Sequence, residues 1–189
     1  MTDTMRDRRR AATSSSHAAL DAVASTFDME TAAGYGAFLA ASAAAMSPLE
    51  LALERAGVEA WLEDWPRRAR RAALARDLAA MDLPAPAIKA LPTPSPAFGA
   101  GLLYVLEGSR LGARVLARQV RRAAPHFPLA YLAHGEGEDL WRSFLTWLEA
   151  RPKVGLRTDE AEAGARYGFQ CFSAAFETVA PPGGLNVRA

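Results

Sequence analysis

Two glycines and an aromatic hydroxyl fall on one face of the longest helix that the sequence predicts. Tyr104, Gly108 and Gly112 follow one another at four-residue intervals, which places them in one row along an α-helix. Each glycine inside a helix costs about 1 kcal/mol relative to alanine, so two in one row need a reason. One reason is the close approach of a neighbouring helix. The other is a large, flat ligand that lies directly on exposed backbone, and the pattern alone leaves both open.

A histidine in the first predicted helix could supply the opposite side of such a site. His17 shares an apolar stripe with Leu20, Ala24 and Phe27. A single histidine on such a face is either a hydrogen-bonded core residue or a ligand of a bound group. Arg10 lies seven residues earlier on the same face, where it could meet an acidic group of that ligand, or it is a solvated charge in a short basic run.

Two separated segments carry these residues, and both resemble the heme oxygenase family, especially its short bacterial branch. Residues 10–21 read RAATSSSHAALD, which is similar to the proximal-helix pattern of the family. Residues 104–113 read YVLEGSRLGA, which is similar to the distal-helix pattern. The resemblance implies that heme lies between these two helices of an all-α, multihelical bundle.

The resemblance also implies roles for individual residues. His17 would be the axial ligand of the heme iron on the proximal side. Gly108 and Gly112 would form the distal face, where backbone atoms touch the porphyrin. Arg10 and Tyr104 would bind the heme propionates, by charge pairing and by a hydroxyl hydrogen bond respectively.

Two positions depart from the animal members of the family in the way that the bacterial branch does. Ser109 stands where animal members have an acidic residue that orders distal water, so we assign Ser109 to the catalytic face together with Gly108 and Gly112. Ala113 replaces a second glycine. Neither change argues against heme binding, although Ser109 leaves the arrangement of distal water open.

The implied reaction is the oxidative cleavage of heme to biliverdin, carbon monoxide and ferrous iron. The porphyrin is cofactor and substrate together, and the protein supplies orientation, an axial ligand and control of water. Electrons would come from ferredoxin, flavodoxin or a reductase, and the product could serve a bilin-using photoreceptor. A non-catalytic heme carrier or sensor on the same helices is the main alternative. A thiaminase-like enzyme using Cys171 and a helical interaction module without a ligand are further alternatives.

The composition predicts the helices that must position these residues. Alanine supplies 42 of the 189 residues, and arginine supplies 20 of the 22 basic ones; both residues favour helices. Ser47-Pro48-Leu49-Glu50 reads as a capping box that starts a new helix. We therefore expect helices over residues 7–27, 30–46, 47–57, 66–81, 95–124, 136–150 and 158–179, with a proline-rich loop over 84–96. The arginines between residues 67 and 71 are expected to form a solvated helix face, or else to dock an acidic ferredoxin.

Composition also limits the class of protein. The chain is expected to form one domain over residues 1–180 with a loose tail over 181–189. A net charge of +1 argues against nucleic-acid binding through an excess of positive charge. With one cysteine, no apolar leader and no long uninterrupted apolar run, we expect a cytoplasmic protein without membrane contact. We also expect a monomer. His126 and His134 are expected at the surface.

Overall fold

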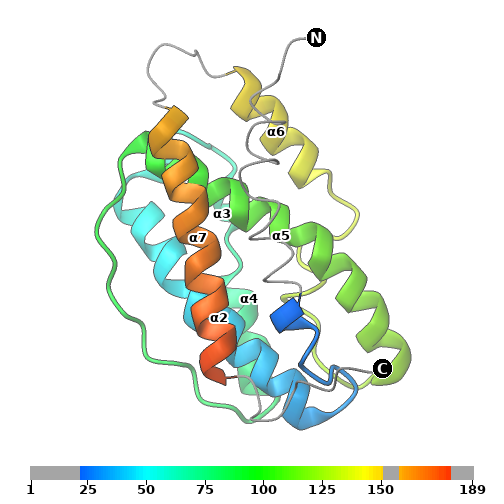
Figure 1. Ribbon diagram of the computed structural model, residues 1–189. Helices are drawn as coiled ribbons and strands as arrows, with labels where there is room; N and C mark the ends of the chain where they lie inside the picture. Colours follow the sequence, from blue (N-terminus) through cyan, green and yellow to red (C-terminus); the bar gives the residue numbers. More distant parts are fainter. Residues whose placement is uncertain (1–21, 151–157, 180–189) are drawn as a thin grey trace, which may run out of the picture.

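The computed structural model describes residues 22–150 and 158–179, which form a helical bundle (Figure 1). A short helical piece at residues 22–24 leads through a turn into α2, so this part of the chain leaves the helix before Phe27, where we had expected the end. The other helices are α2 (Ala32–Arg55), α3 (Trp65–Arg68), α4 (Arg71–Ala80), α5 (Pro96–Ala123), α6 (Leu140–Ala150) and α7 (Thr158–Val179). No strand occurs in the described ranges, which confirms the all-α prediction.

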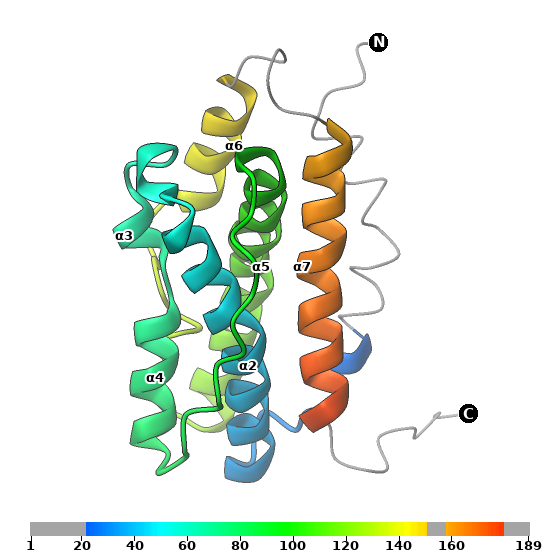
Figure 2. The same cartoon turned by 90° about the vertical axis from the view of Figure 1, so that its left-hand side faces the viewer.

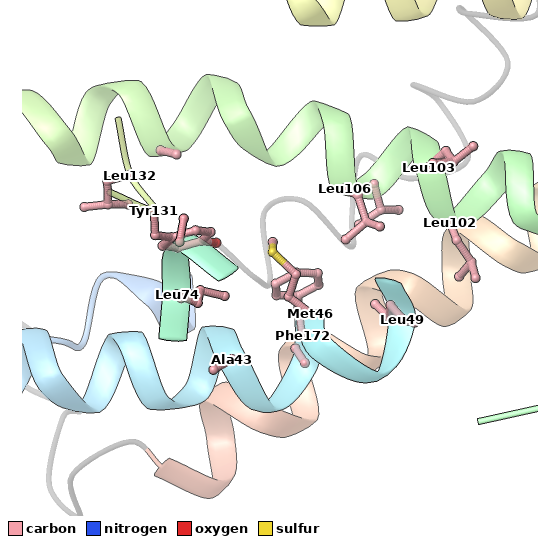
Figure 3. Close-up of a cluster of buried hydrophobic side chains, with 14 of the residues drawn as sticks. Ala43, Met46, Leu49, Leu74, Leu102, Leu103, Leu106, Tyr131, Leu132 and Phe172 are labelled. Carbon is pink, nitrogen blue, oxygen red and sulfur yellow. The ribbon is translucent and has the colours of Figure 1, made fainter. Parts of the chain in front are cut away.

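Helix α7 packs along α5 and along α2 (Figure 2). Helix α4 covers the other side of α2, and α6 packs on α5. Leucine, methionine and phenylalanine side chains from α2, α5 and α7 fill the space between them (Figure 3). Burying this apolar surface is the main term that stabilises the arrangement. One face of α5 is thereby held opposite α7.

The predicted break before Pro48 is wrong, because α2 runs through it. Thr31 caps this helix by accepting the Gly34 N–H with its hydroxyl at 3.1 Å. Pro48 lies inside the helix. The Glu50 carboxylate, which we had assigned to a local capping box, instead accepts the backbone N–H groups of Arg70 and Arg71 at 2.8 and 2.9 Å. Glu50 therefore caps the start of α4, a use that no local pattern reveals.

The predicted helix over residues 66–81 is also wrong, since it is divided into α3 and α4. Ala69 adopts an extended conformation between them. The solvated arginine face is wrong at two of its positions, because Arg68 and Arg70 are 2% and 1% exposed. Arg67 remains exposed, as expected.

The second half of the chain follows the predictions more closely. Helix α5 is capped by the Ser95 hydroxyl, which accepts the Phe98 N–H at 3.2 Å, and α7 has the predicted bounds. Helix α6 begins four residues later than expected, after Gly135 and Gly137 have taken up positive φ values of 70° and 83° in the preceding turns. By length and composition α2 could cross a membrane, but 78% of its most apolar window is buried inside the protein.

Candidate active site on the glycine face of α5

The glycines of α5 have two different kinds of surroundings. A Cβ on Gly101 would lie 2.0 Å from the backbone oxygen of Ala161 in α7, so this glycine lets the two helices cross closely. Within the described residues, a Cβ on Gly112 would meet no atom within 4 Å, and a Cβ on Gly108 would meet only the ring of Trp141, at 3.7 Å. Close packing against α7 therefore explains Gly101, and no helix in the described ranges packs closely enough to explain Gly108 or Gly112.

A pocket of about 290 Å³ opens beside Gly108 and Gly112. Its other walls are mainly apolar, and α7 contributes Phe169, Phe172 and Phe176 to them. An adjoining hollow of about 420 Å³ also reaches Gly112. Together these spaces fall within the roughly 300–1,000 Å³ that is typical of small-molecule sites. Bare backbone on one side and phenylalanine rings on the other suit a large, flat, apolar ring system.

One buried arginine contacts both polar side chains that line the pocket, Ser109 and Tyr131. Arg70 Nη2 donates to Ser109 Oγ at 2.8 Å, and the guanidinium lies 5.4 Å from the centre of the Tyr131 ring. Burial, and next the charge of Arg110, lower the pKa of Arg70. Its Nε and Nη1 have no acceptor within the part of the chain that the structure describes. These donors would be satisfied by ordered water or by a ligand oxygen.

The remaining predicted site residues divide between described and undescribed parts of the chain. Tyr104 lies on α5 and is 6% exposed, with its ring 5.5 Å from that of Trp141. Ser109 Oγ also donates to the Leu106 carbonyl at 2.7 Å. His17 and Arg10 lie outside the described residues. The structure thus brings Gly108, Ser109 and Gly112 to one pocket, whereas Tyr104 packs against Trp141 and does not line it. The roles of all these residues stay predictions.

Comparison with known proteins identifies the family. No family model matches the chain. A curated protein of Xanthomonas campestris pv. campestris (strain 8004), named heme oxygenase, is 37% identical over 123 residues, which are 62% of this chain and 73% of that protein. The chain belongs to the heme oxygenase family.

The fold of this heme oxygenase also matches a solved structure. A heme oxygenase from Neisseria meningitidis, solved in its NO- and CO-bound forms, superposes with a TM-score of 0.79. The match covers 96% of this chain and 98% of that one at 23% sequence identity, which shows the shared fold. The heme oxygenase fold and enzyme class that the two motifs implied are therefore confirmed.

The motif analysis of this heme oxygenase missed Arg70 and Tyr131. Arg70 belongs to the run that we had expected in solvent, and nothing in its spacing distinguishes it from the exposed Arg67. Tyr131 lies in the loop after α5, where no periodicity applies. Only the packing of α4 and this loop against α5 brings either residue to the pocket.

The thiol that a thiaminase-like enzyme would use is unsuited to nucleophilic chemistry here. Burial raises the pKa of the half-buried Cys171 thiol, and this lowers the fraction of reactive thiolate. No group of three or more histidine, cysteine or carboxylate residues in the described ranges could hold a metal ion.

His126 is exposed as predicted, but His134 is half-buried beside Arg110, so its surface assignment is wrong.

A buried ionic cluster lies behind the face of α5 that carries Gly108 and Gly112, which we call the glycine face. Glu107 Oε2 accepts from Arg68 Nη1 at 2.6 Å and from Arg110 Nε at 3.0 Å, and its Oε1 accepts from Arg110 Nη2 at 2.9 Å. Arg68 also donates to both Asp64 oxygens at 2.7 Å, which lowers the pKa of Asp64. Because Glu107 precedes Gly108, this cluster fixes the glycine segment of α5 against α3.

His134 is expected to make the protein sensitive to acid above the range where carboxylates titrate. Burial, and next the charges of Arg110 and Arg70, lower its pKa from 6.5 to about 4. As the pH falls below 6.5, the unfolded chain gains a proton at His134 that the folded protein does not, so the free energy of unfolding falls until about pH 4. Allowing for partial exposure, we expect a loss of about 1 kcal/mol between pH 7 and pH 5.

Melting temperatures at both pH values for His134→Asn and for His126→Asn check this expectation. His134→Asn should reduce the acid-induced drop, and His126→Asn should leave it as in the wild type, because His126 is exposed. Equal drops in all three proteins would show that His134 does not contribute.

Proposed function

We propose that this heme oxygenase cleaves heme to biliverdin, carbon monoxide and ferrous iron, with the glycine face of α5 as its distal wall. The observation that carries the proposal is the pocket beside Gly112, where a Cβ would meet no atom of residues 22–150 or 158–179 within 4 Å. Each glycine inside a helix destabilises it relative to alanine, and no backbone in the described ranges packs closely on these two, so their presence favours a ligand on that face.

The residues of this chain would hold and orient the heme. His17 would bind the iron through an imidazole nitrogen, and Arg10 and Tyr104 would bind the propionates. Gly108 and Gly112 would admit the porphyrin to contact with backbone atoms, which keeps ionisable side chains away from the iron. Bound heme supplies the iron at which oxygen is activated, and its porphyrin is the substrate.

Control of water on the distal side would fall to Ser109 and Arg70. The Arg70 guanidinium already donates to Ser109 Oγ at 2.8 Å. Its two donors without an acceptor in the described residues could order water beside the serine. Fixed donors of this kind stabilise charge that develops on a bound ligand without reorganising during the reaction.

The external electrons would come from ferredoxin, flavodoxin or a reductase, and we propose that the protein acts as a cytoplasmic monomer. A bilin-using photoreceptor is one destination for the product. The non-catalytic carrier differs from the proposed enzyme only in what happens after heme binds, so turnover is the property to measure.

The decisive experiment adds hemin to the purified protein and then a reductant. We expect one hemin per chain with a sharp Soret band, and release of biliverdin when a ferredoxin and its reductase, or ascorbate, is added. A heme spectrum that persists under reductant and oxygen would contradict the proposed reaction and support a carrier.

The axial ligand is tested by His17→Ala with His126→Ala as the matched control. Loss of the imidazole should abolish the native six-coordinate spectrum, and added imidazole should restore it by filling the same position. His126→Ala should keep the wild-type spectrum. A wild-type spectrum of His17→Ala without imidazole would show that another group binds the iron.

A further inference from the structure

The loop that follows α5 supplies the inner wall of the pocket. Tyr131 and Leu132 line it and are 4% and 2% exposed, whereas Leu111, at the pocket rim, is 46% exposed. Figure 3 shows Tyr131 and Leu132 on the core side of α5, among the buried side chains. A ring that lies in this pocket against α5 would meet Tyr131 at the buried wall.

Tyr131 is held through its backbone by an aspartate from another helix. Asp77 of α4 accepts the Tyr131 N–H at 2.8 Å and the Ala130 N–H at 2.9 Å, one with each carboxylate oxygen. Asp77 is itself 1% exposed. A buried carboxylate that receives two backbone donors fixes the position of the loop at this point.

Tyr131 is also held through its ring. The Arg70 guanidinium lies 5.4 Å from the ring centre, within the range of a cation–π contact. Through its 2.8 Å bond to Ser109, the same guanidinium connects the tyrosine to the glycine face. The distance between the inner wall and the distal face is therefore fixed by direct contacts.

A rigid inner wall limits the rotation of a flat ligand. A porphyrin has nearly fourfold symmetry, so the position of its outer edge against the wall decides which edge carbon lies beneath the glycines. We propose that Tyr131 determines which edge of the porphyrin is cleaved, and that Asp77 is the positioning residue that holds Tyr131 in place. This inference rests on the proposed heme-cleaving function.

The test compares the ratio of biliverdin isomers among variants whose fold and heme stoichiometry are checked first. Tyr131→Leu removes the ring, and we expect the ratio to change by about three-fold or more. Tyr131→Phe keeps the ring and should retain the wild-type ratio. Asp77→Asn replaces one acceptor with a donor that faces a backbone N–H, and the ratio should shift in the same direction as in Tyr131→Leu. If the leucine variant does not fold, Tyr131→Met serves the same purpose.

Tyr35→Phe is the matched control for general loosening of the loop. Tyr35 Oη donates to the Pro128 carbonyl at 2.6 Å, so its loss frees the same loop three residues before Tyr131. We expect lower thermal stability in Tyr35→Phe with an unchanged isomer ratio. A wild-type ratio in the Tyr131 and Asp77 variants, or an equal shift in Tyr35→Phe, would overturn the inference. If the wild-type protein releases no biliverdin, the proposed function itself fails and this inference fails with it.

Discussion

Gly112→Leu is expected to abolish heme turnover while the heme-free protein melts at or above the wild-type temperature. A Cβ at Gly112 meets no described atom within 4 Å and faces two hollows, so we expect the leucine to find room in the heme-free protein. Leucine also favours the helix by nearly 1 kcal/mol over glycine. In the heme complex, the same side chain would occupy the space between the porphyrin and α5, because a packed interior has no spare volume for a leucine. Hemin titration, turnover and melting of the heme-free protein measure both effects.

Gly101→Ala is the control that separates a ligand face from a packing face on the same helix. Its Cβ would lie 2.0 Å from the Ala161 oxygen, so α5 and α7 must separate even without heme. Overpacking of this kind typically costs about 1–3 kcal/mol, and a clash with backbone is the severe case. A Gly112→Leu protein that melts well below the wild type and still degrades heme normally would contradict the assignment of Gly112 to the distal face.

The glycine face could be predicted from sequence because it depends on one helix. The spacing of Tyr104, Gly108 and Gly112 is a property of α5 alone, and the caps of α5 and the bounds of α7 follow from local signals. What the spacing could not supply was the choice between a packing face and a ligand face. That choice depends on where α7 crosses α5, which is at Gly101 and not at the later glycines.

The elements that sequence analysis predicted wrongly are those shaped by distant partners. Ser47-Pro48-Leu49-Glu50 satisfies the local rule for a helix start, yet Glu50 binds the backbone of Arg70 and Arg71, about twenty residues away. The helix expected over residues 66–81 is divided at the same place, where the Glu50 carboxylate receives those N–H groups. The local sequence cannot show that the Glu50 carboxylate caps another helix.

The burial of the arginines has the same origin. Arg68 lies in an arginine-rich run of the kind that is usually found at a protein surface. It is buried because Glu107 and Asp64 neutralise its charge there. Its remaining donors reach the Leu140 carbonyl and Ser143 Oγ, both at 2.8 Å, which fixes the start of α6. A guanidinium can be buried only where its donors find acceptors, and three separate segments of the chain provide them here.

Glu107→Gln is expected to be among the most destabilising single substitutions in the protein. The Glu107 carboxylate is 1% exposed and lies between Arg68 and Arg110, whose side chains are 1% and 3% exposed. The amide removes the negative charge and leaves two buried guanidinium groups facing each other. Removing one partner of a buried ion pair costs about 3–5 kcal/mol. In a chain of this length, that loss lowers the melting temperature by roughly 6–20 °C.

Glu136→Gln is the matched control, since it makes the same chemical change at another glutamate that pairs with an arginine of α5. Glu136 pairs with Arg121, and their side chains are 53% and 42% exposed. Solvent screens this pair, so we expect a much smaller loss of stability than in Glu107→Gln. Denaturant unfolding of the two variants compares the same substitution in a buried and in an exposed pair. If Glu107→Gln lost no more stability than Glu136→Gln, the cluster behind the glycine face would not be what holds α5 against α3.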